Sequence, residues 1–302
     1  MPTRRGEAFS STRKFSTIMI KRQIMRLVQK TLGVALGDVA AASVAYRSSV
    51  IDKHLQEVRE RMPENPAASG LSVYSQNEED GIISGIFKSM AVMAPKFMEF
   101  GVHITENNSL NILLNGGRGA WIDKGLTPFK KTARENDKLL LVDRYIDINN
   151  IYTICEEVKA FLAIDSFLDL DLVSLDLDGN DYYLIEEVVS KGVRPKVFCL
   201  EYNAKFPPPQ KTKITYNAAH RWLNNDDYYG CSLQAYVDLL APFRYHLLCC
   251  NITGSNCFFV REDVVGAFNI RPVTELYQPP RPFLSPFPKG ASPSIKYLKS
   301  IL

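Results

Sequence analysis

The sequence predicts an α/β fold in which helices cover both faces of a mostly parallel, Rossmann-like sheet with an antiparallel hairpin near its carboxyl end. Two observations predict it. Five short apolar runs alternate with helical patterns, which is typical of parallel strands buried on both faces. Two further runs, 245–251 and 256–263, are separated only by the turn "ITGS". Strands joined that tightly have to be antiparallel.

The expected elements follow one another in a regular order. An apolar face at helical spacing predicts a helix over 34–61, and "PENPAASG" at 63–70 breaks that pattern. The run "SQNEEDGIISGIFKSM" at 75–90 predicts a helix capped by Ser75 or Asn77. Strands are then expected at 96–102, 119–123, 138–143, 170–178 and 196–203, and helices at 150–163, 181–192 and 232–243.

Composition is that of an ordinary globular protein and argues against a nucleic-acid partner. Of 302 residues, 46% are hydrophobic and 23% charged, and the net charge is only +3. So small a charge argues against nucleic-acid binding. No apolar run reaches the roughly 18–20 residues that span a bilayer. The six cysteines form no CxxC pair, so we expect reduced, buried thiols in a cytoplasmic protein.

Three regions are expected along the chain. They are a basic helical extension at 1–62, a Rossmann-like domain at 70–268 and a proline-rich tail at 269–302. The first thirty residues carry eight Lys or Arg against one acid, Glu7. Three interpretations stay open for them: an amphipathic helix on the periphery of an anionic membrane, an organelle transit peptide, or a solvated lead-in. The tail is expected to wrap the surface or to contact a second copy in a homo-oligomer.

Acidic residues stand at the end of nearly every predicted strand, where open parallel sheets bind their ligands. Asp123 occupies the position at which a carboxylate accepts hydrogen bonds from ribose hydroxyls. Gly101 lets the backbone approach a ligand closely or adopt an unusual dihedral angle. The loop "GVHITENN" lacks GxGxxG, so a nucleoside without phosphates fits better than a dinucleotide, and an acidic rim suits the sulfonium of S-adenosylmethionine. The strand-end residues are Glu99 with Gly101, Asp123, Asp143, Asp176 with Asp178, and Glu201 with Asn203.

These features resemble the class I methyltransferases, and several blocks resemble the FkbM-type methyltransferase family. The blocks are "KFMEFGV…ENNSLNILLNGGRGAWID", "VSLDLDGNDYY", "VFCLEYN", "YYGCSL" and "GSNCFFVRED", within 74–263. The resemblance implies an S-adenosylmethionine-dependent O-methyltransferase that acts on a sugar, a glycan or a small natural product. It also implies the cofactor contacts: Glu99 and Gly101 beside the methionine part, Asp123 on the ribose, Asp143 near the adenine, and Asp176 or Asp178 near the sulfonium.

Methyl transfer needs alignment and a deprotonated acceptor hydroxyl. The candidate bases are Asp178, Glu201 and His220. Oxygen ligands from Asp178, Glu201 and Asn203 would suit Mg²⁺, which lowers the pKa of a bound hydroxyl.

Three other interpretations of the acidic cluster stay open. Asp176 and Asp178 match the DxD pair with which a glycosyltransferase holds a metal ion. A non-catalytic module on the same fold is the second. The third is a plain strand-end turn in which Asn180 or Asp181 caps the following helix.

Overall fold

The computed structural model describes residues 37–39, 41–103, 107–126, 137–222, 227–281 and 284. The chain divides into two units, Met1–Val50 and Ile51–Leu302. In the first unit, residues 41–50 are helical as predicted, with Val44 exposed. The basic segment 1–30 and most of the predicted tail lie outside the described residues. Within the described ranges, none of the helices combines the length and apolarity that crossing a membrane requires.

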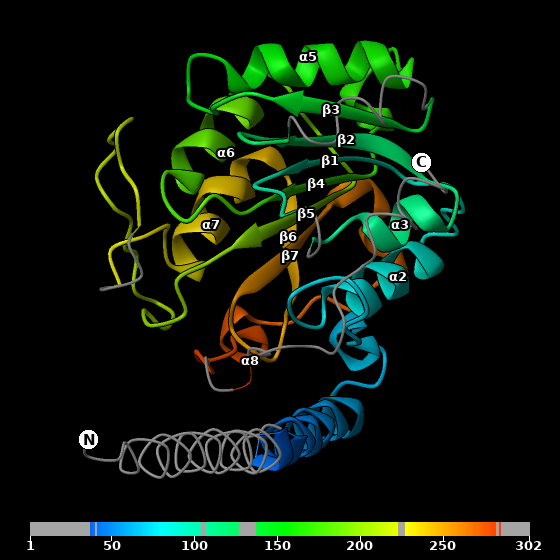
Figure 1. The fold of residues 1–302 in the computed structure, drawn as a ribbon, viewed down its shortest axis with the longest axis vertical. Coiled ribbons are helices and arrows are strands. Elements are labelled where there is room, and N and C mark those ends of the chain that lie inside the picture. Colours follow the sequence, from blue (N-terminus) through cyan, green and yellow to red (C-terminus); the bar gives the residue numbers. More distant parts are fainter. Residues whose placement is uncertain are drawn as a thin grey trace, which may run out of the picture. The chain divides into compact units, whose positions relative to one another are not determined.

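Seven strands of the second unit form one sheet in the order β3-β2-β1-β4-β5-β7-β6 (Figure 1). The first five run parallel, whereas β7 is antiparallel to both β5 and β6. The predicted α/β sheet with a closing hairpin is therefore confirmed. The strands are β1 (Lys96–Phe100), β2 (Arg118–Asp123), β3 (Leu139–Asp143), β4 (Leu172–Leu175), β5 (Val197–Glu201), β6 (Tyr245–Cys250) and β7 (Asn256–Arg261).

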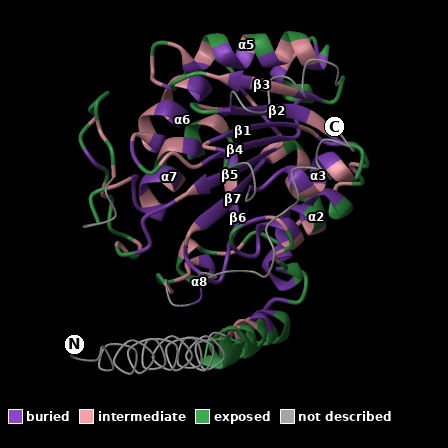
Figure 2. Ribbon diagram, in the orientation of Figure 1, coloured by how far each residue is buried: buried purple, intermediate pink, exposed green. Residues whose placement is uncertain are grey.

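Helices lie on both faces of this sheet, with α5, α6 and α7 on one side and α2 and α3 on the other (Figure 1). The strands between them are almost wholly buried (Figure 2), which is why their sequences read as continuous apolar runs. The helices are α2 (Glu79–Ser89), α3 (Leu110–Leu114), α5 (Ile151–Leu162), α6 (Asp181–Ser190), α7 (Leu233–Leu240) and α8 (Val273–Leu276). Residues 51–61 are helical as well, and the described residues also form the 3-10 helices η1 (Pro66–Ser69), η3 (Phe167–Asp169), η4 (Ala241–Phe243) and η5 (Glu262–Ala267).

Large aromatic side chains fill the core between the sheet and the helices. Trp121, Phe97, Phe198 and Phe258 each have at most a trace of exposed surface. Burial of one such side chain stabilises the fold by about 1.5–3 kcal/mol, so the sheet is a rigid platform for the polar residues at its strand ends. All six cysteines are buried free thiols, as the spacing predicted.

The predicted helix over 75–90 begins later than its sequence suggested. It starts at Glu79, and its N-cap is Glu78 rather than Ser75 or Asn77. The reason is that residues 73–75 turn back over the Asp80 carboxylate, whose Oδ2 accepts hydrogen bonds from three consecutive backbone N–H groups at 2.6–2.8 Å. Ser75 still contributes, because its hydroxyl accepts a hydrogen bond from the Asp80 N–H at 3.1 Å.

Candidate active site

The order of the strands reverses between β1 and β4, and both strands are extended by one residue at their carboxyl ends. Gly101 N donates to the Ile122 carbonyl and Asp176 N to the Phe100 carbonyl, each at 3.1 Å. Open α/β sheets bind ligands in the crevice outside such a switch point. The sheet therefore places a candidate site beside Gly101 and Asp176.

Five of the strand-end residues predicted from the sequence fall on one transverse row of the sheet. Asp123 is paired with Asp143, and Glu201 with Asn256. The other positions follow by extending the β1–β2, β1–β4 and β4–β5 registers by one residue. Side chains at one register level of neighbouring strands point to the same face. The row is Asp143, Asp123, Gly101, Asp176, Glu201 and Asn256.

Gly101 interrupts this row because the backbone leaves no room for a side chain. Its φ is +85°, in the left-handed region, and a Cβ built there would lie 1.5 Å from the Asp176 carbonyl oxygen. The close approach predicted for Gly101 is thus an approach to the protein's own backbone. It brings the ends of β1 and β4 together at the switch point.

Replacing Gly101 by alanine is expected to destabilise the protein strongly. Gly116→Ala is the matched control, because Gly116 has a similar φ of +94° but open space around its missing Cβ. The left-handed conformation costs an alanine about 1–2 kcal/mol at either position. The clash at Gly101 should add roughly 1–3 kcal/mol. Urea unfolding measures both variants, and equal losses of stability would contradict the close contact.

Glu99 lies at the end of β1 but supports the site from beneath rather than lining it. Its carboxylate accepts hydrogen bonds from the Asn108 backbone N–H, at 2.7 Å, and from the Ser109 hydroxyl. The Ser109 hydroxyl in turn accepts one from the Trp121 indole. Burial raises the pKa of Glu99 to about 7, against the lowering effect of these hydrogen bonds. These bonds hold the start of α3, and the contact predicted with the methionine part of a cofactor stays a prediction.

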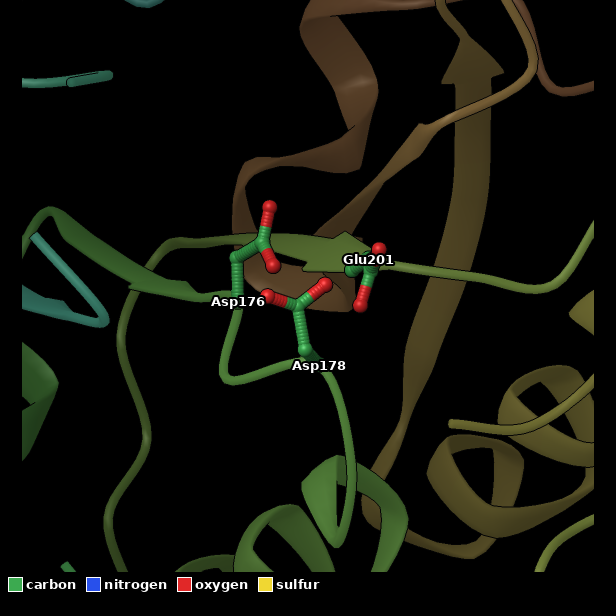
Figure 3. A group of neighbouring side chains, drawn as sticks. All are labelled: Asp176, Asp178 and Glu201. Atoms are coloured by element: carbon green, nitrogen blue, oxygen red, sulfur yellow. The ribbon is translucent and has the colours of Figure 1, made fainter. Parts of the chain in front are cut away.

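Three carboxylates converge at the ends of β4 and β5 (Figure 3). Asp176, Asp178 and Glu201 each offer an oxygen, and these oxygens lie within 4.8 Å of one another. Asp178 reaches the group because its backbone is left-handed, with φ +54°. Burial of the carboxyl groups and their mutual repulsion raise the pKa values of Asp176 and Glu201 well above the usual range. Burial also raises the pKa of Asp178.

The turn that carries Asp178 is held by the first residue of α6. The Asp181 carboxylate accepts hydrogen bonds from the Leu177 N–H at 2.8 Å and the Gly179 N–H at 2.7 Å. It therefore stabilises the turn and does not cap the helix. Asn180 occupies the N-cap position without a side-chain capping bond, so the predicted capping role of Asn180 or Asp181 is wrong.

A cavity of about 490 Å³ opens beside this turn. Asp123 and Asp178 reach it from the ends of β2 and β4, and His220 also lines it, so the structure brings three of the predicted residues to one space. Among the other charged and aromatic residues that line the cavity, the sequence predicted only His220. These residues are Lys124, Tyr145, His220, Arg221 and Trp222.

The segment that carries His220 is fastened over the cavity by hydrogen bonds to the β4–α6 turn. Asn180 Nδ2 donates to the Asn217 carbonyl at 2.8 Å, and Asn217 N donates back to Asn180 Oδ1 at 3.2 Å. Tyr145 donates to the Ala218 carbonyl at 2.6 Å. His220 Nε2 is buried and has no hydrogen-bond partner among the described residues. Its hydrogen-bonding capacity is therefore not used by the described residues.

The other predicted site residues lie away from this cavity. Asp143 sits beside Asp123 and accepts a hydrogen bond from the Gly125 N–H at 2.8 Å. Asn203 is fully engaged: its amide donates to the Asp227 and Tyr229 carbonyls and accepts from the Lys205 N–H. It therefore holds the 227–229 segment. Of the predicted metal ligands Asp178, Glu201 and Asn203, the first two approach each other and Asp176, whereas the Asn203 amide is bonded to the 227–229 segment.

A buried polar cluster around Glu79 was missed. Glu79 Oε1 accepts hydrogen bonds from the Asn251 and Asn256 amides at 2.6 and 2.9 Å, and Oε2 accepts one from the Asn77 N–H. Because Asn256 pairs with Glu201, this cluster adjoins the acidic group. Acids in the first turn of a helix normally complement the helix dipole from a solvated position, which concealed the signal. Tyr145 was also missed, although its place two residues after the third strand is a signal.

Solved structures that the chain resembles include proteins named as methyltransferases. A candidate S-adenosylmethionine-dependent methyltransferase of Listeria monocytogenes is 11% identical over 59% of this chain and 98% of its own, with a TM-score of 0.35. The 1,6-didemethyltoxoflavin-N1-methyltransferase of Burkholderia thailandensis is 10% identical over 73% and 87%, with a TM-score of 0.33. An O-methyltransferase family protein of the same species is 8% identical over 72% and 71%, with a TM-score of 0.33.

No protein-family model matches the chain, and no curated protein matches it either. With TM-scores below 0.5, the structural likenesses carry no argument about cofactor or acceptor. The fold class follows from the order and the directions of the strands in the sheet.

Proposed function

We propose that the protein is an S-adenosylmethionine-dependent O-methyltransferase that acts on a hydroxyl of a sugar, a glycan or a small natural product in the cytoplasm. The observation that carries the proposal is the cavity of about 490 Å³, which Asp123 and Asp178 enter from two strand ends beside the switch point. A volume of this size lies within the range of roughly 300–1,000 Å³ for small-molecule sites.

Asp123 suits the ribose of such a cofactor. One of its carboxylate oxygens accepts a hydrogen bond from the Lys124 N–H, and the other has no hydrogen-bond partner among the described residues. Burial and the neighbouring Asp143 raise the pKa of Asp123, against the hydrogen bond from the Lys124 N–H. Ribose hydroxyls that donate to the free oxygen would stabilise the ionised form.

Asp178 is placed to accept the proton of the acceptor hydroxyl. When bound, S-adenosylmethionine supplies a methyl group on a sulfonium, which makes that carbon electrophilic. Asp178 would take up the proton that the acceptor hydroxyl loses when it is methylated. Its raised pKa makes it a stronger base than an ordinary aspartate. His220 Nε2, on the same cavity, is the second candidate, whereas Glu201 lies behind Asp178 in the acidic group.

Removal of the Asp123 carboxylate is expected to weaken cofactor binding by about tenfold or more. Hydrogen bonds to a charged group contribute about 1.5–3 kcal/mol, and each 1.4 kcal/mol is a factor of ten. Isothermal titration with S-adenosylhomocysteine measures Asp123→Ala against Asp165→Ala, which removes an exposed acid elsewhere. Unchanged affinity in Asp123→Ala would remove this residue from the proposed site.

A glycosyltransferase is the second candidate, because the Asp176 and Asp178 carboxylates do approach each other as a DxD pair requires. The same titration discriminates between the two functions. Binding of the adenosyl compound supports methyl transfer. Binding of a uridine-diphosphate sugar with Mn²⁺, without binding of the adenosyl compound, supports the alternative. Binding of neither compound favours a non-catalytic module.

A further inference from the structure

We infer that Asp176, Asp178 and Glu201 together bind one divalent metal ion. The three carboxylates come from the turn after β4 and from the last residue of β5. Their oxygens lie within 4.8 Å of one another, which is the spacing at which a single ion contacts all three (Figure 3). Oxygen-only ligands select hard cations such as Mg²⁺, Mn²⁺ and Ca²⁺.

Two oxygens without hydrogen-bond partners, one in the cluster and one beside it, are a further indication of a cation site. Glu201 Oε2 is buried and has no hydrogen-bond partner among the described residues. Asn256 is only 4% exposed, faces Glu201 across the β5–β7 ladder, and its Oδ1 is likewise buried without a partner. Opposed residues in an antiparallel pair share one face of the sheet. Both atoms are acceptors, so a cation or a donor is the group that would satisfy them.

Within the described ranges, the protein's own cations do not neutralise this group. Among the described residues, no ion pair includes Asp176, Asp178 or Glu201. Three carboxylates this close repel one another strongly unless a cation or a proton intervenes. Lys124 and Arg221 reach the cavity, but neither forms an ion pair with an acid of the group.

Asp178 belongs both to the cluster and to the cavity wall, so a bound ion would lie at the edge of the acceptor space. There it would contact an acceptor hydroxyl and lower that hydroxyl's pKa, leaving His220 Nε2 as the proton acceptor. This role rests on the proposed function. Binding of the ion does not.

Titration of the full-length chain with Mn²⁺, followed by electron paramagnetic resonance without any nucleoside present, tests the site. We expect one Mn²⁺ per chain, displaced by excess Mg²⁺. Asp178→Asn should weaken this binding at least tenfold, and Glu201→Gln likewise. Asp238→Asn, which removes an exposed acid paired with Lys211, should leave it unchanged. No stoichiometric Mn²⁺ at millimolar concentration, or equal binding by Asp178→Asn, would overturn the inference.

Thermal unfolding supplies a second measurement that does not depend on catalysis. Mn²⁺ should raise the melting temperature of the wild type but not that of Asp178→Asn. Without metal, Asp178→Asn should melt above the wild type, because the substitution removes one acid from a group whose carboxyl groups repel one another. A failure here is distinguishable from failure of the proposed function, since S-adenosylhomocysteine binding is titrated separately in metal-free buffer.

Discussion

Replacing Asp178 by asparagine is expected to lower the rate of methyl transfer by roughly 10²–10⁴-fold, the usual contribution of a positioned acid or base. The amide accepts no proton from the acceptor hydroxyl. It is also a poor replacement for a carboxylate ligand of a metal ion. The loss is therefore expected whether Asp178 removes the proton itself or helps to hold a cation that acidifies the hydroxyl.

The variant should fold, so that the lost rate reports on chemistry. Asp178 is exposed at residue level and has a left-handed backbone with φ +54°. Asparagine tolerates this conformation better than almost any residue except glycine. The bonds that shape the turn come from the Asp181 carboxylate, which the substitution leaves in place.

The effect is measured by following the transfer of a tritiated methyl group from S-adenosylmethionine to a hydroxyl compound that the wild type methylates. The values of kcat and KM are determined separately for the wild type and the variant. A fall in kcat with little change in KM identifies a group that acts in the transition state. A rise in KM alone would mean that Asp178 only binds the acceptor. Retention of a third or more of the wild-type kcat would remove it from the chemistry.

His220→Gln is the informative comparison within the same cavity. Glutamine keeps a polar group at a similar distance but cannot accept a proton at neutral pH. If a metal ion acidifies the hydroxyl, both variants lose turnover, and the loss in His220→Gln persists at saturating Mn²⁺. If Asp178 acts alone, His220→Gln loses much less than Asp178→Asn does.

The convergence of strand-end acids was predictable because parallel strands in register end at one edge. Asp123, Asp143, Asp176 and Glu201 indeed share one transverse row. Alternation of side chains then fixes the common face, and no tertiary information is needed for it. The sequence predicts the row because the apolar strands have similar lengths and each of them has an acidic residue at or beside its end.

The partners of each oxygen were not predictable, because they depend on turns and on distant segments. Asp178 joins Asp176 and Glu201 only through its left-handed backbone. Asn203, two residues after the strand-end acid of β5, donates its amide hydrogens instead to the carbonyls of residues 227 and 229. Asn180 reaches Asn217, 37 residues away, where local spacing suggested a helix cap. Such choices are made by long-range contacts that a local pattern does not contain.

Glu78, the residue before α2, is expected to make the stability of the protein depend on pH. Glu78 is 3% exposed, and its Oε2 is buried without a hydrogen-bond partner among the described residues. Burial, reinforced by the neighbouring Glu79, raises the pKa of Glu78 to about 8, although backbone N–H groups of Thr253 and Ile252 act in the opposite direction. An unfolded glutamate titrates near 4.3.

Between about pH 4.5 and 8 the folded protein therefore binds a proton at Glu78 that the unfolded chain releases. Stability falls as the pH rises wherever the native state binds more protons. This group alone should lower the free energy of unfolding by about 1.4 kcal/mol per pH unit across that window. Below it, Glu78 is protonated in both states and has no effect.

Glu78→Gln should abolish this part of the slope, because glutamine resembles the protonated acid and does not titrate. Urea unfolding at pH 5, 6, 7 and 8 measures the slope, with Glu60→Gln as the exposed control. Glu99, whose pKa is raised to about 7, adds a similar slope to all three proteins, so the comparison isolates Glu78. The variant should gain on the wild type steadily from pH 5 to pH 8. Parallel curves for the two proteins would mean that Glu78 is ionised in the folded state, and the buried environment beside the β6–β7 turn would then have to contain a cation or water that stabilises it.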